Sequence, residues 1–468
     1  MQTLLKKNLT IIDIIEYLFK ISYLLLAFAT FNSFVFGKPV VSVLVAVTFG
    51  LGSILMLERL VHWRVYIGMP YLIWLILFIV SFAISTIINM QYGFLENVKW
   101  IVWTSFQMLL LYARRTDEST DKYKREFGLI SKIIIGYSFF AAIASIILLL
   151  IGYSKVWIFE ANGQRIIQGF IWGRLWGVYT DPNYGAVIGV ISIILSLFFL
   201  KKAVRVPRII YIINIIFQFL YIVFSDSRTG KVALIVSIAF YLYAILLKHR
   251  QNIKSIKKMI LNISVTIFVC ILILLGMKAV RVSYNEVVSP LLSHIRIMNN
   301  SIEEEESEKI GREEDIKSDP SNRRFDIWES GMEILKTAPI FGTGYVTFVP
   351  YAEQNVPDTY VLENDHGVFS SMHNGFLNIL VYQGLFGFLV FMIFTISVML
   401  KILGGIWKLE GEEYRYGITM LTCIGGVVCS MMFLLEGTYT NSIGAIVLWS
   451  FLGWLVQLLA PNHKSVKS

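Results

Sequence analysis

Four short stretches of the chain combine arginine or histidine with turn-forming residues, which are residue types that bind anions and move protons. They are GRLWGVYTDPNYGA (173–186), FSDSRTGKVA (224–233), NRRFDIW (322–328) and SSMHNGFLNILVYQGLFG (370–387). A guanidinium group presents a planar fork of N–H donors that suits a phosphate. A neutral imidazole accepts a proton near neutral pH. These stretches therefore predict anion binding beside general-base catalysis.

The first stretch sets Arg174 among aromatic and glycine residues, just before an apolar run. Glycine neighbours let the backbone approach a ligand closely, so that the guanidinium group can bind a phosphate. The alternative is an interfacial arginine whose charged head reaches back to water. The triplet Asp181-Pro182-Asn183 indicates a turn that opens a helix, and we expect Asn183 to cap this helix rather than to contact a ligand.

The second stretch places Arg228 in a short turn between two apolar runs. An arginine inside the hydrocarbon costs roughly 2.5 to 3.5 kcal/mol on insertion scales, so its side chain should face something polar. Pairing with Asp226 is the structural alternative to ligand binding. The sequence SRTGK is not a nucleotide-binding phosphate loop, because Ser225 stands where that motif needs glycine and Val232 where it needs Ser or Thr.

The fourth stretch carries His373 just before a long apolar run. With an ordinary pKa near 6.5, this imidazole is the candidate general base. The alternative is a helix-capping or hydrogen-bonded surface histidine. His366, Glu363 and Asp365 lie nearby, but their spacing does not match a compact set of metal ligands, and we expect no metal site.

The composition indicates the class of protein to which these side chains belong. Of 468 residues, 56% are apolar and 16% are charged, and the mean hydropathy is +0.66. This composition is typical of a polytopic membrane protein and excludes soluble α/β and all-β classes. The excess of 41 basic over 32 acidic residues then marks cytoplasmic loops, and it does not indicate nucleic-acid binding. Cys270, Cys423 and Cys429 all lie in apolar runs, which favours neither disulfides nor a thiolate metal site.

The apolar runs predict an all-α integral membrane protein with about twelve transmembrane helices, at about 20 residues per span. Nine lie within residues 1–276, and three, followed by a cytoplasmic tail, lie within 374–468. The predicted spans are near 17–36, 39–57, 69–90, 96–113, 129–152, 183–200, 207–224, 229–247, 258–276, 374–400, 416–434 and 441–460.

Alternate connections are rich in Lys and Arg, which places them and both termini in the cytoplasm. The opposite connections are then extracytoplasmic, and two of them are long: 153–182 and 277–373. All four chemical stretches fall on this outer side. The basic connections are 58–64, 113–126, 201–208, 248–258 and 401–415.

The longer outer connection, 277–373, contains two different segments. Residues 301–322 are acidic and lack apolar periodicity, which favours a solvated linker over a site for a cation or a basic partner. Residues 322–338 predict an amphipathic helix that lies along the outer interface or caps the bundle and ends at Pro339. Its apolar face is Phe325, Trp328, Met332 and Leu335.

Taken together, GRLWGVYTDPN, SDSRTG, the R-x-x-x-W of Arg324 to Trp328 and HNGFLNILVYQGLFG resemble signature pieces of the bacterial O-antigen ligase and polysaccharide polymerase family. The resemblance covers about residues 165–400, in the right order. It implies an enzyme that joins lipid-linked glycans outside the cytoplasmic membrane. Its architecture would be that of the multispanning, lipid-sugar-dependent (GT-C-like) glycosyltransferases.

The resemblance also implies roles for particular residues. Arg174, Arg228 and Arg324, with Arg323 beside it, would bind the diphosphate of an undecaprenyl-diphosphate-linked oligosaccharide. His373 would deprotonate the acceptor hydroxyl, and a single displacement would invert the anomeric centre without metal or cofactor. Supporting positions are Asn183, Asp226, Trp328 and Asn374. Outer tyrosines, Tyr179 and Tyr345, are expected to stack on sugars.

Polymerase and ligase share this donor, so the motifs leave both open. The many Ile, Lys and Asn residues suit an AT-rich genome, as of a Gram-positive bacterium without lipid A, and therefore favour a polymerase of capsular or other surface polysaccharide. A flippase and a chain-length regulator would be its partners. A flippase for lipid-linked sugars would also have about twelve spans and buried arginines. However, the polar groups gather at one rim and the chain shows no internal repeat, which favours catalysis. A peptidoglycan strand polymerase is a further alternative, usually argued from an outer carboxylate rather than from His373.

Overall fold

The computed structural model describes residues 10–116, 118–159, 163–249, 256–298, 309–311, 321, 323–364 and 367–460. Most of the predicted acidic linker, His366, Asp365, the predicted tail after residue 460 and part of the 248–258 connection lie outside these residues.

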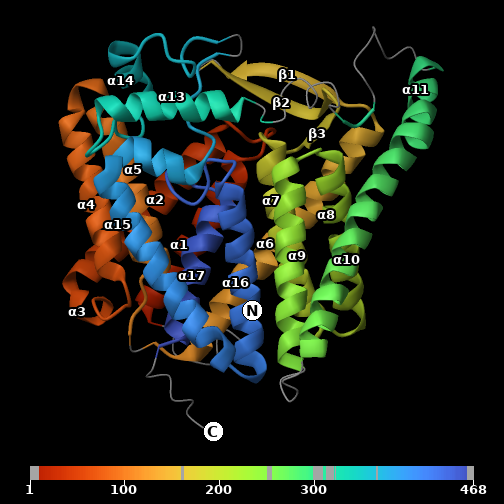
Figure 1. Ribbon diagram of the computed structural model, residues 1–468, viewed down its shortest axis with the longest axis horizontal. Helices are drawn as coiled ribbons and strands as arrows, with labels where there is room; N and C mark the ends of the chain where they lie inside the picture. Colours follow the sequence, from red (N-terminus) through yellow and green to blue (C-terminus); the bar gives the residue numbers. More distant parts are fainter. Residues whose placement is uncertain are drawn as a thin grey trace.

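Long helices standing side by side form the body of the molecule (Figure 1). Each predicted span overlaps one of them, with η2 continuing α5. Their bounds are α1 (Ile11–Thr30), α2 (Pro39–Val61), α4 (Leu72–Ile88), α5 (Phe94–Ser105), η2 (Phe106–Tyr112), α6 (Thr120–Leu150), α7 (Pro182–Leu200), α8 (Arg205–Phe224), α9 (Arg228–His249), α10 (Ile256–Ser283), α15 (Gly375–Gly405), α16 (Gly411–Met431) and α17 (Ile443–Leu458).

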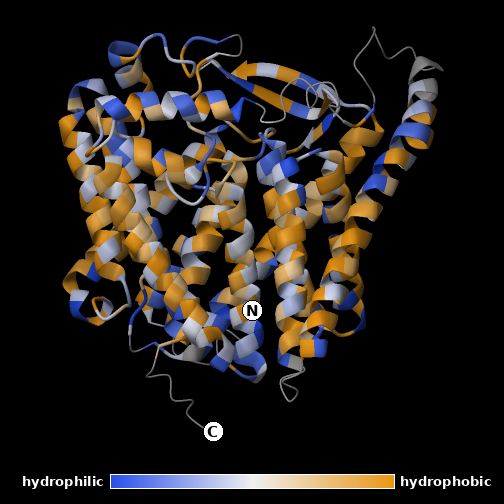
Figure 2. Cartoon of the chain, viewed as in Figure 1, coloured by the Kyte–Doolittle hydropathy of each residue, from blue (hydrophilic) through white to orange (hydrophobic). Residues whose placement is uncertain are grey.

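Apolar residues predominate in the middle of the bundle, and polar residues are more frequent at its two ends (Figure 2). Within the described residues, 7 helices are long and apolar enough to cross a membrane, and α4 and α17 are shorter apolar helices. The protein is thus a mostly helical, multispan membrane protein. The total of twelve crossings stays a prediction. Short helical segments link the long ones: α3 (Trp63–Tyr66), η1 (Met90–Tyr92) and η4 (Ile406–Lys408).

One end of the bundle, called the α13 end below, is covered by a polar layer. Helix α13 (Arg324–Thr337) runs across the ends of the long helices, near α14 (Phe348–Asn355) (Figure 1). Beside them lies an antiparallel sheet in the order β1-β2-β3, made of Ser154–Phe159, Gln164–Ile171 and Arg174–Gly177. The all-α prediction was wrong here, because strands this short leave no span-length signal.

One helix end also differs from the prediction. Helix α10 does not end at 276 but continues to Ser283 and then through η3 (Tyr284–Val288) into α11 (Ser289–Met298). Hydropathy marks where apolar residues stop, and the helical backbone goes on beyond that point. The extension is held where the Arg281 guanidinium donates to the carbonyl of Ile310 at 3.1 Å.

Helix α13 forms where the amphipathic pattern predicted it, but only part of the predicted face is buried: Leu335 is 7% exposed. Phe325 and Met332 are 68% and 43% exposed, whereas Ile327 and Ile334 are buried. Gly331 explains the difference, since a Cβ added there would meet the sulfur of Met372 at 2.5 Å. A small residue at this point lets the helix approach the chain before α15 closely, so this side packs inward.

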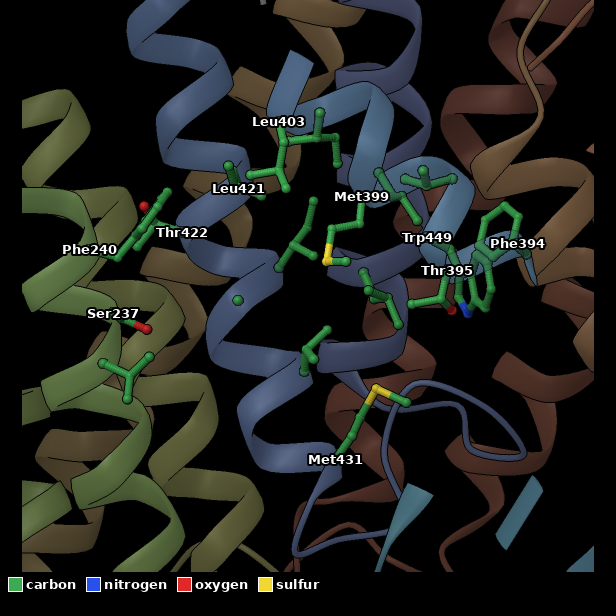
Figure 3. Close-up of a pocket in the computed structure, with 18 of the residues that line it drawn as sticks. Ser237, Phe240, Phe394, Thr395, Met399, Leu403, Leu421, Thr422, Met431 and Trp449 are labelled. Atoms are coloured by element: carbon green, nitrogen blue, oxygen red, sulfur yellow. The ribbon is translucent and has the colours of Figure 1, made fainter. Parts of the chain in front are cut away.

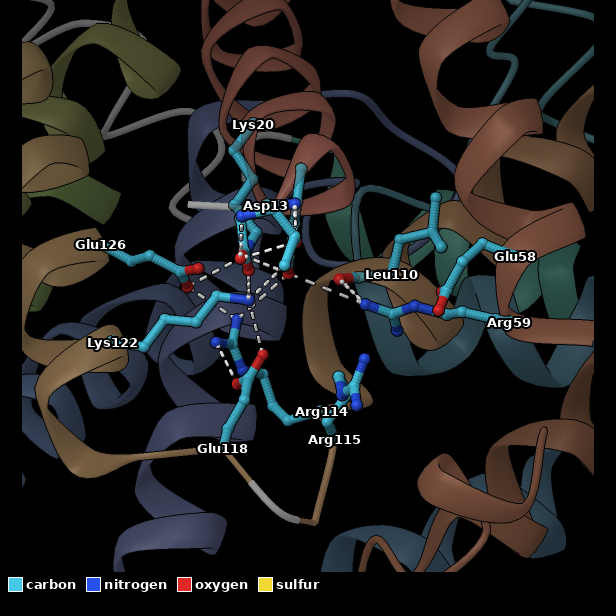
Figure 4. Close-up of polar contacts among 12 residues, drawn as sticks. Asp13, Lys20, Glu58, Arg59, Leu110, Arg114, Arg115, Glu118, Lys122 and Glu126 are labelled. Atoms are coloured by element: carbon cyan, nitrogen blue, oxygen red, sulfur yellow. Dashed lines mark hydrogen bonds and ion pairs between the residues drawn. The ribbon is translucent and has the colours of Figure 1, made fainter. Parts of the chain in front are cut away.

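The opposite end of the bundle holds a buried network of charges (Figure 4). Glu126 accepts from Lys20 at 2.9 Å and from Arg114 at 2.7 Å, and all three side chains are at most 2% exposed. Arg59 donates to the carbonyl groups of Leu110 and Ala113 near the end of η2. Acids and bases balance, which is how charge is accommodated away from water. The acids are Asp13, Glu16, Glu118 and Glu126; the bases are Lys20, Arg59, Arg114 and Lys122.

Replacing Glu126 by Gln should destabilise the protein by about 3 kcal/mol or more, because Lys20 and Arg114 lose a shared buried counter-charge. Unfolding in detergent would measure the change. Glu96→Gln is the matched control, since Glu96 pairs with Lys99 on the surface and both side chains are more than half exposed. Equal losses in the two variants would contradict a special role for the buried network.

Candidate functional site

The first two chemical stretches meet through one amide group. The Arg174 guanidinium, at the start of β3, donates from Nη2 to Oδ1 of Asn183 at 3.0 Å and from Nε to the carbonyl of Ser225 at 2.9 Å. Ser227 donates to the same Asn183 oxygen at 2.9 Å. Arg228 follows directly as the first residue of α9. The sheet, α7 and the turn before α9 are therefore joined around Asn183.

Asn183 does not cap α7, so that expectation was wrong. Asp181 occupies the N-cap position, and its carboxylate accepts from the backbone N–H of Asn183 at 2.6 Å. Pro182 supplies the first helical residue, whose missing N–H costs nothing there. With the cap provided by Asp181, the Asn183 amide is turned to Arg174.

The third and fourth stretches meet at the end of α13. Trp328, on α13, donates from Nε1 to the carbonyl of Met372 at 3.0 Å. On the other side of His373, Asn374 caps α15 by accepting from the N–H groups of Phe376 and Leu377 at 3.0 and 3.1 Å. Trp328 and Asn374 therefore hold the backbone on both sides of His373.

The backbone around these residues is strained. Trp172, Asp226, Arg323 and His373 all have a positive φ, between 47° and 65°. The left-handed region is unfavourable for side chains other than glycine and occurs mainly where surrounding contacts enforce it, often at functional sites. All four chemical stretches contain or adjoin one such residue.

A polar cavity of about 100 Å³ lies at the α13 end. It brings together His373, Arg323, Arg324 and Asn183, and Arg174 reaches it through its hydrogen bond to Asn183. Arg228 is not among the residues that line this cavity. The described lining residues are Asp181, Asn183, Arg323, Arg324, Ile327, Phe369, His373, Phe433 and Leu434.

The surroundings of His373 favour its neutral form. Burial lowers the pKa of His373 below its ordinary value; the negative charge of Asp181 opposes this shift, and the positive charge of Arg324 adds to it. A histidine with a lowered pKa stays unprotonated at neutral pH and only becomes charged at lower pH. The imidazole is thus able to accept a proton.

The segment between α16 and α17, residues 432–442, forms another wall of the cavity through Phe433 and Leu434. It holds Glu436, which is 1% exposed and accepts a hydrogen bond from Ser442. Burial raises the pKa of Glu436 to about 7, against the hydrogen bonds from Ser442 and the N–H groups of Gly437 and Ala445. Sequence reasoning missed this residue, although an acid between two apolar runs was a visible signal.

Asp226 and the two outer tyrosines have close partners in the structure. Asp226 forms an ion pair with Lys231 at 2.6 Å, one turn along α9. Tyr179 is 1% exposed and packs on Tyr221, so its predicted stacking against sugars was wrong. Tyr345 stacks on Tyr439 of the 432–442 segment with ring centroids 5.2 Å apart.

With this geometry in place, similarity to known proteins becomes informative. Residues 213–392 match the family model described as O-antigen ligase. This part of the chain is O-antigen ligase-like. The resemblance drawn from the motifs is thereby confirmed for the segment that holds Arg228, Arg324 and His373, while Arg174 and Asn183 precede it.

A relative in Haemophilus influenzae, described as an uncharacterized protein, is 27% identical over 218 residues. The alignment covers 46% of this chain and 48% of that protein, so it spans about half the length of each.

Replacing Asn183 by Leu should lower stability by roughly 1.5 to 3 kcal/mol, because hydrogen bonds to the charged Arg174 are lost in a partly buried place. Asn183→Asp keeps an acceptor for both Arg174 and Ser227 and should unfold close to the wild type. Thermal unfolding in detergent compares the two, with the exposed Asn355→Leu as control. Similar unfolding of all three variants would show that the shared amide contributes little.

Proposed function

We propose that the protein transfers a glycan from an undecaprenyl-diphosphate-linked oligosaccharide to an acceptor glycan in the polar cavity. The observation that carries this proposal is the meeting of Arg323, Arg324 and His373 with the Asn183–Arg174 pair in one small cavity. We place the reaction at the outer face of the cytoplasmic membrane, on the basis of the basic loops at the other end of the bundle.

The arginines would bind the diphosphate and neutralise the departing group. Negative charge grows on the diphosphate as its bond to the anomeric carbon breaks, and fixed guanidinium groups in a partly dry site stabilise such charge. Arg323 and Arg324 line the cavity directly. Arg174 and Arg228 would complete the site from its α7 and α9 side once the larger donor is bound.

His373 would act as the general base. The acceptor hydroxyl gives its proton to the imidazole while its oxygen bonds to the anomeric carbon. The bond between that carbon and the diphosphate oxygen breaks, and its electron pair leaves with the undecaprenyl diphosphate. One displacement inverts the anomeric configuration. A positioned base of this kind contributes about 10²- to 10⁴-fold in rate, and the lowered pKa of His373 supports the assignment.

A second, apolar cavity offers a place for the lipid tail. It has a volume of about 390 Å³ and lies between α9, α15, α16 and α17 (Figure 3). Side chains such as Phe240, Met399, Leu421 and Trp449 line it. An apolar cavity in a helical bundle suits a hydrocarbon chain better than a sugar.

The apolar cavity ends close to the polar one. Its lining includes Phe376 and Met431, whereas the polar cavity is lined by His373 and Phe433, two or three residues away on the same segments. Gly375 packs against Met431, since a Cβ added there would lie 3.2 Å from the Met431 methyl group. A donor with a polar head and an apolar tail can thus occupy both cavities at once.

Among the reactions open to this donor, we propose polymerisation of repeat units into a capsular or other surface polysaccharide. Transfer of the glycan to a different acceptor, as by an O-antigen ligase, uses the same cavities and remains the alternative. A flippase and a chain-length regulator are the partners that a polymerase needs. A flippase function for this chain itself is less well supported, because a general base facing arginines serves bond formation.

Purified protein should lengthen a labelled undecaprenyl-diphosphate oligosaccharide, and Arg228→Lys and His373→Ala should lose most of this activity. Lysine keeps the charge but cannot make a two-pronged contact with phosphate, and alanine removes the base. Arg281→Lys, an arginine on α10, is the control. Lipid-linked donor that crosses vesicle membranes without any lengthening would instead indicate a flippase.

Gly425→Leu should raise the KM for a long-tailed donor about 10-fold, the effect of excluding roughly 55 Å² of apolar surface. Gly425 lines the apolar cavity, and a Cβ added there meets no atom within 4 Å, so the new side chain fits into the open space. Gly136→Leu on α6 is the matched control, because that glycine also has open space but does not line the cavity.

The comparison uses two donors, one with the full tail and one with a two-isoprene tail. The Gly425 variant should discriminate against the long tail alone. An equal KM increase for both donors, or an equal effect of Gly136→Leu, would rule out the apolar cavity as the tail site.

A further inference from the structure

Asp181 is the one carboxylate among the described residues that line the polar cavity. It is placed there as the N-cap of α7, through the hydrogen bond from the Asn183 N–H. The rest of the polar lining, Arg323, Arg324 and Asn183, suits an anion. A negative charge in the same cavity repels a diphosphate and therefore requires a separate explanation.

Capping does not explain the charge. Asn, Ser and Asp are about equally good N-cap residues, because each offers a side-chain oxygen to the first turn of the helix. A neutral cap would hold α7 as well and would not oppose the donor. The cavity already holds the positive charges of Arg323 and Arg324, and a further positive charge forms there when His373 takes up a proton.

His373 is the group that becomes positive. It lines the same cavity from the segment before α15, and the Asp181 charge raises its pKa against the effects of burial and Arg324. Asp181 therefore stabilises the imidazolium form, which exists once the acceptor proton has been taken up. Because the cavity is only about 100 Å³, an acceptor hydroxyl bound in it lies near both side chains.

We propose that Asp181 is a positioning residue that acts through His373: its carboxylate stabilises the imidazolium formed when the acceptor sugar hydroxyl is deprotonated. It thereby marks the acceptor side of the cavity, away from the diphosphate. This inference rests on the proposed function. The proton passes from hydroxyl to imidazole and stays there, so Asp181 itself neither gains nor loses one.

Other charged groups lie in or near the polar cavity, and their effects on the pKa of His373 must be distinguished from the effect of Asp181. Arg323 and Arg324 approach from α13, and Arg174 lies behind Asn183. Glu436 lies in the 432–442 segment. Burial and, to a smaller extent, the charge of Asp181 raise its pKa to about 7, so its titration would also affect an activity profile near neutral pH. Asp226 is paired with Lys231 at the turn before α9.

The test measures kcat and donor KM from pH 4.5 to 8.5 for the full-length wild type, Asp181→Asn and Glu436→Gln. Asn keeps the helix cap, so the first substitution removes the charge alone. We expect kcat at neutral pH to fall about 10-fold in Asp181→Asn, because the base is weaker. The acid limb of its kcat profile should move to lower pH, since the pKa of His373 falls further, while donor KM stays equal or decreases.

Two results would overturn the inference. One is a higher donor KM with an unchanged pH profile, which would make Asp181 part of the donor site. The other is loss of the acid limb in Glu436→Gln, which would assign the pH dependence to Glu436. If Asp181→Asn is unstable in detergent, Asp181→Ser provides a second neutral cap for the same measurements.

A direct titration separates this inference from the proposed function. Diethylpyrocarbonate modifies neutral imidazole, and mass spectrometry of the peptide containing His373 gives its rate of modification at each pH. The midpoint should lie at lower pH in Asp181→Asn than in the wild type. This shift is expected whether or not the wild type lengthens glycans, so an absence of transfer would reject the function alone, and an unchanged midpoint would reject the role of Asp181.

Discussion

The structure depends on how charged side chains are accommodated in a bundle made mostly of apolar residues. Guanidinium and ammonium groups away from water need partners, and the two ends of the molecule provide them differently. At the end opposite α13, four acids and four bases neutralise one another, as where Arg114 lies between Glu118 and Glu126. At the α13 end, Arg323 and Arg324 line a cavity that has one carboxylate among its described lining residues.

This contrast distinguishes the arginines of the buried charge network from those proposed to bind the donor. Arg114 is 1% exposed and is surrounded by carboxylates, so an incoming anion would have to compete with them. Two contacts of the Arg174 guanidinium are to neutral oxygens, those of Asn183 and Ser225. Such acceptors orient a guanidinium group, which is consistent with the proposed binding of a phosphorylated headgroup at the α13 end.

Much of the fold could be predicted from the sequence because a membrane span needs a long apolar run. The helices α7, α8 and α9 therefore overlap the predicted spans closely. The same criterion cannot detect the sheet, because its strands have only six, eight and four residues. It also cannot predict how α13 packs. The side of α13 that lies against the chain before α15 is set by the small residue Gly331 rather than by the large apolar residues.

The sequence points to individual candidate site residues but not to their arrangement. Arginine and histidine stand out in apolar surroundings, whereas nothing in the sequence shows that Asn183 links Arg174 to Ser227. Asp181 and Glu436 were missed for opposite reasons. Asp181 belongs to a turn motif that already accounts for it, and Glu436 lies in a short connection whose burial becomes evident only when the helices are packed.

The 432–442 segment relates the two cavities to each other. The segment is held from three sides: Gln107 donates to the Thr440 carbonyl, Trp449 donates to the Gly437 carbonyl, and Gln383 donates to the side-chain hydroxyl of Tyr439. A segment tied to the bundle in this way is a rigid wall. The polar cavity beside it is too small for an oligosaccharide, so entry of a glycan requires the other walls to move. Arg323 and Arg324 line the cavity from the α13 side. Helix α13 contacts the segment before α15 through Trp328 and Gly331, so the groups proposed to bind the diphosphate are tied to the segment that carries the proposed base.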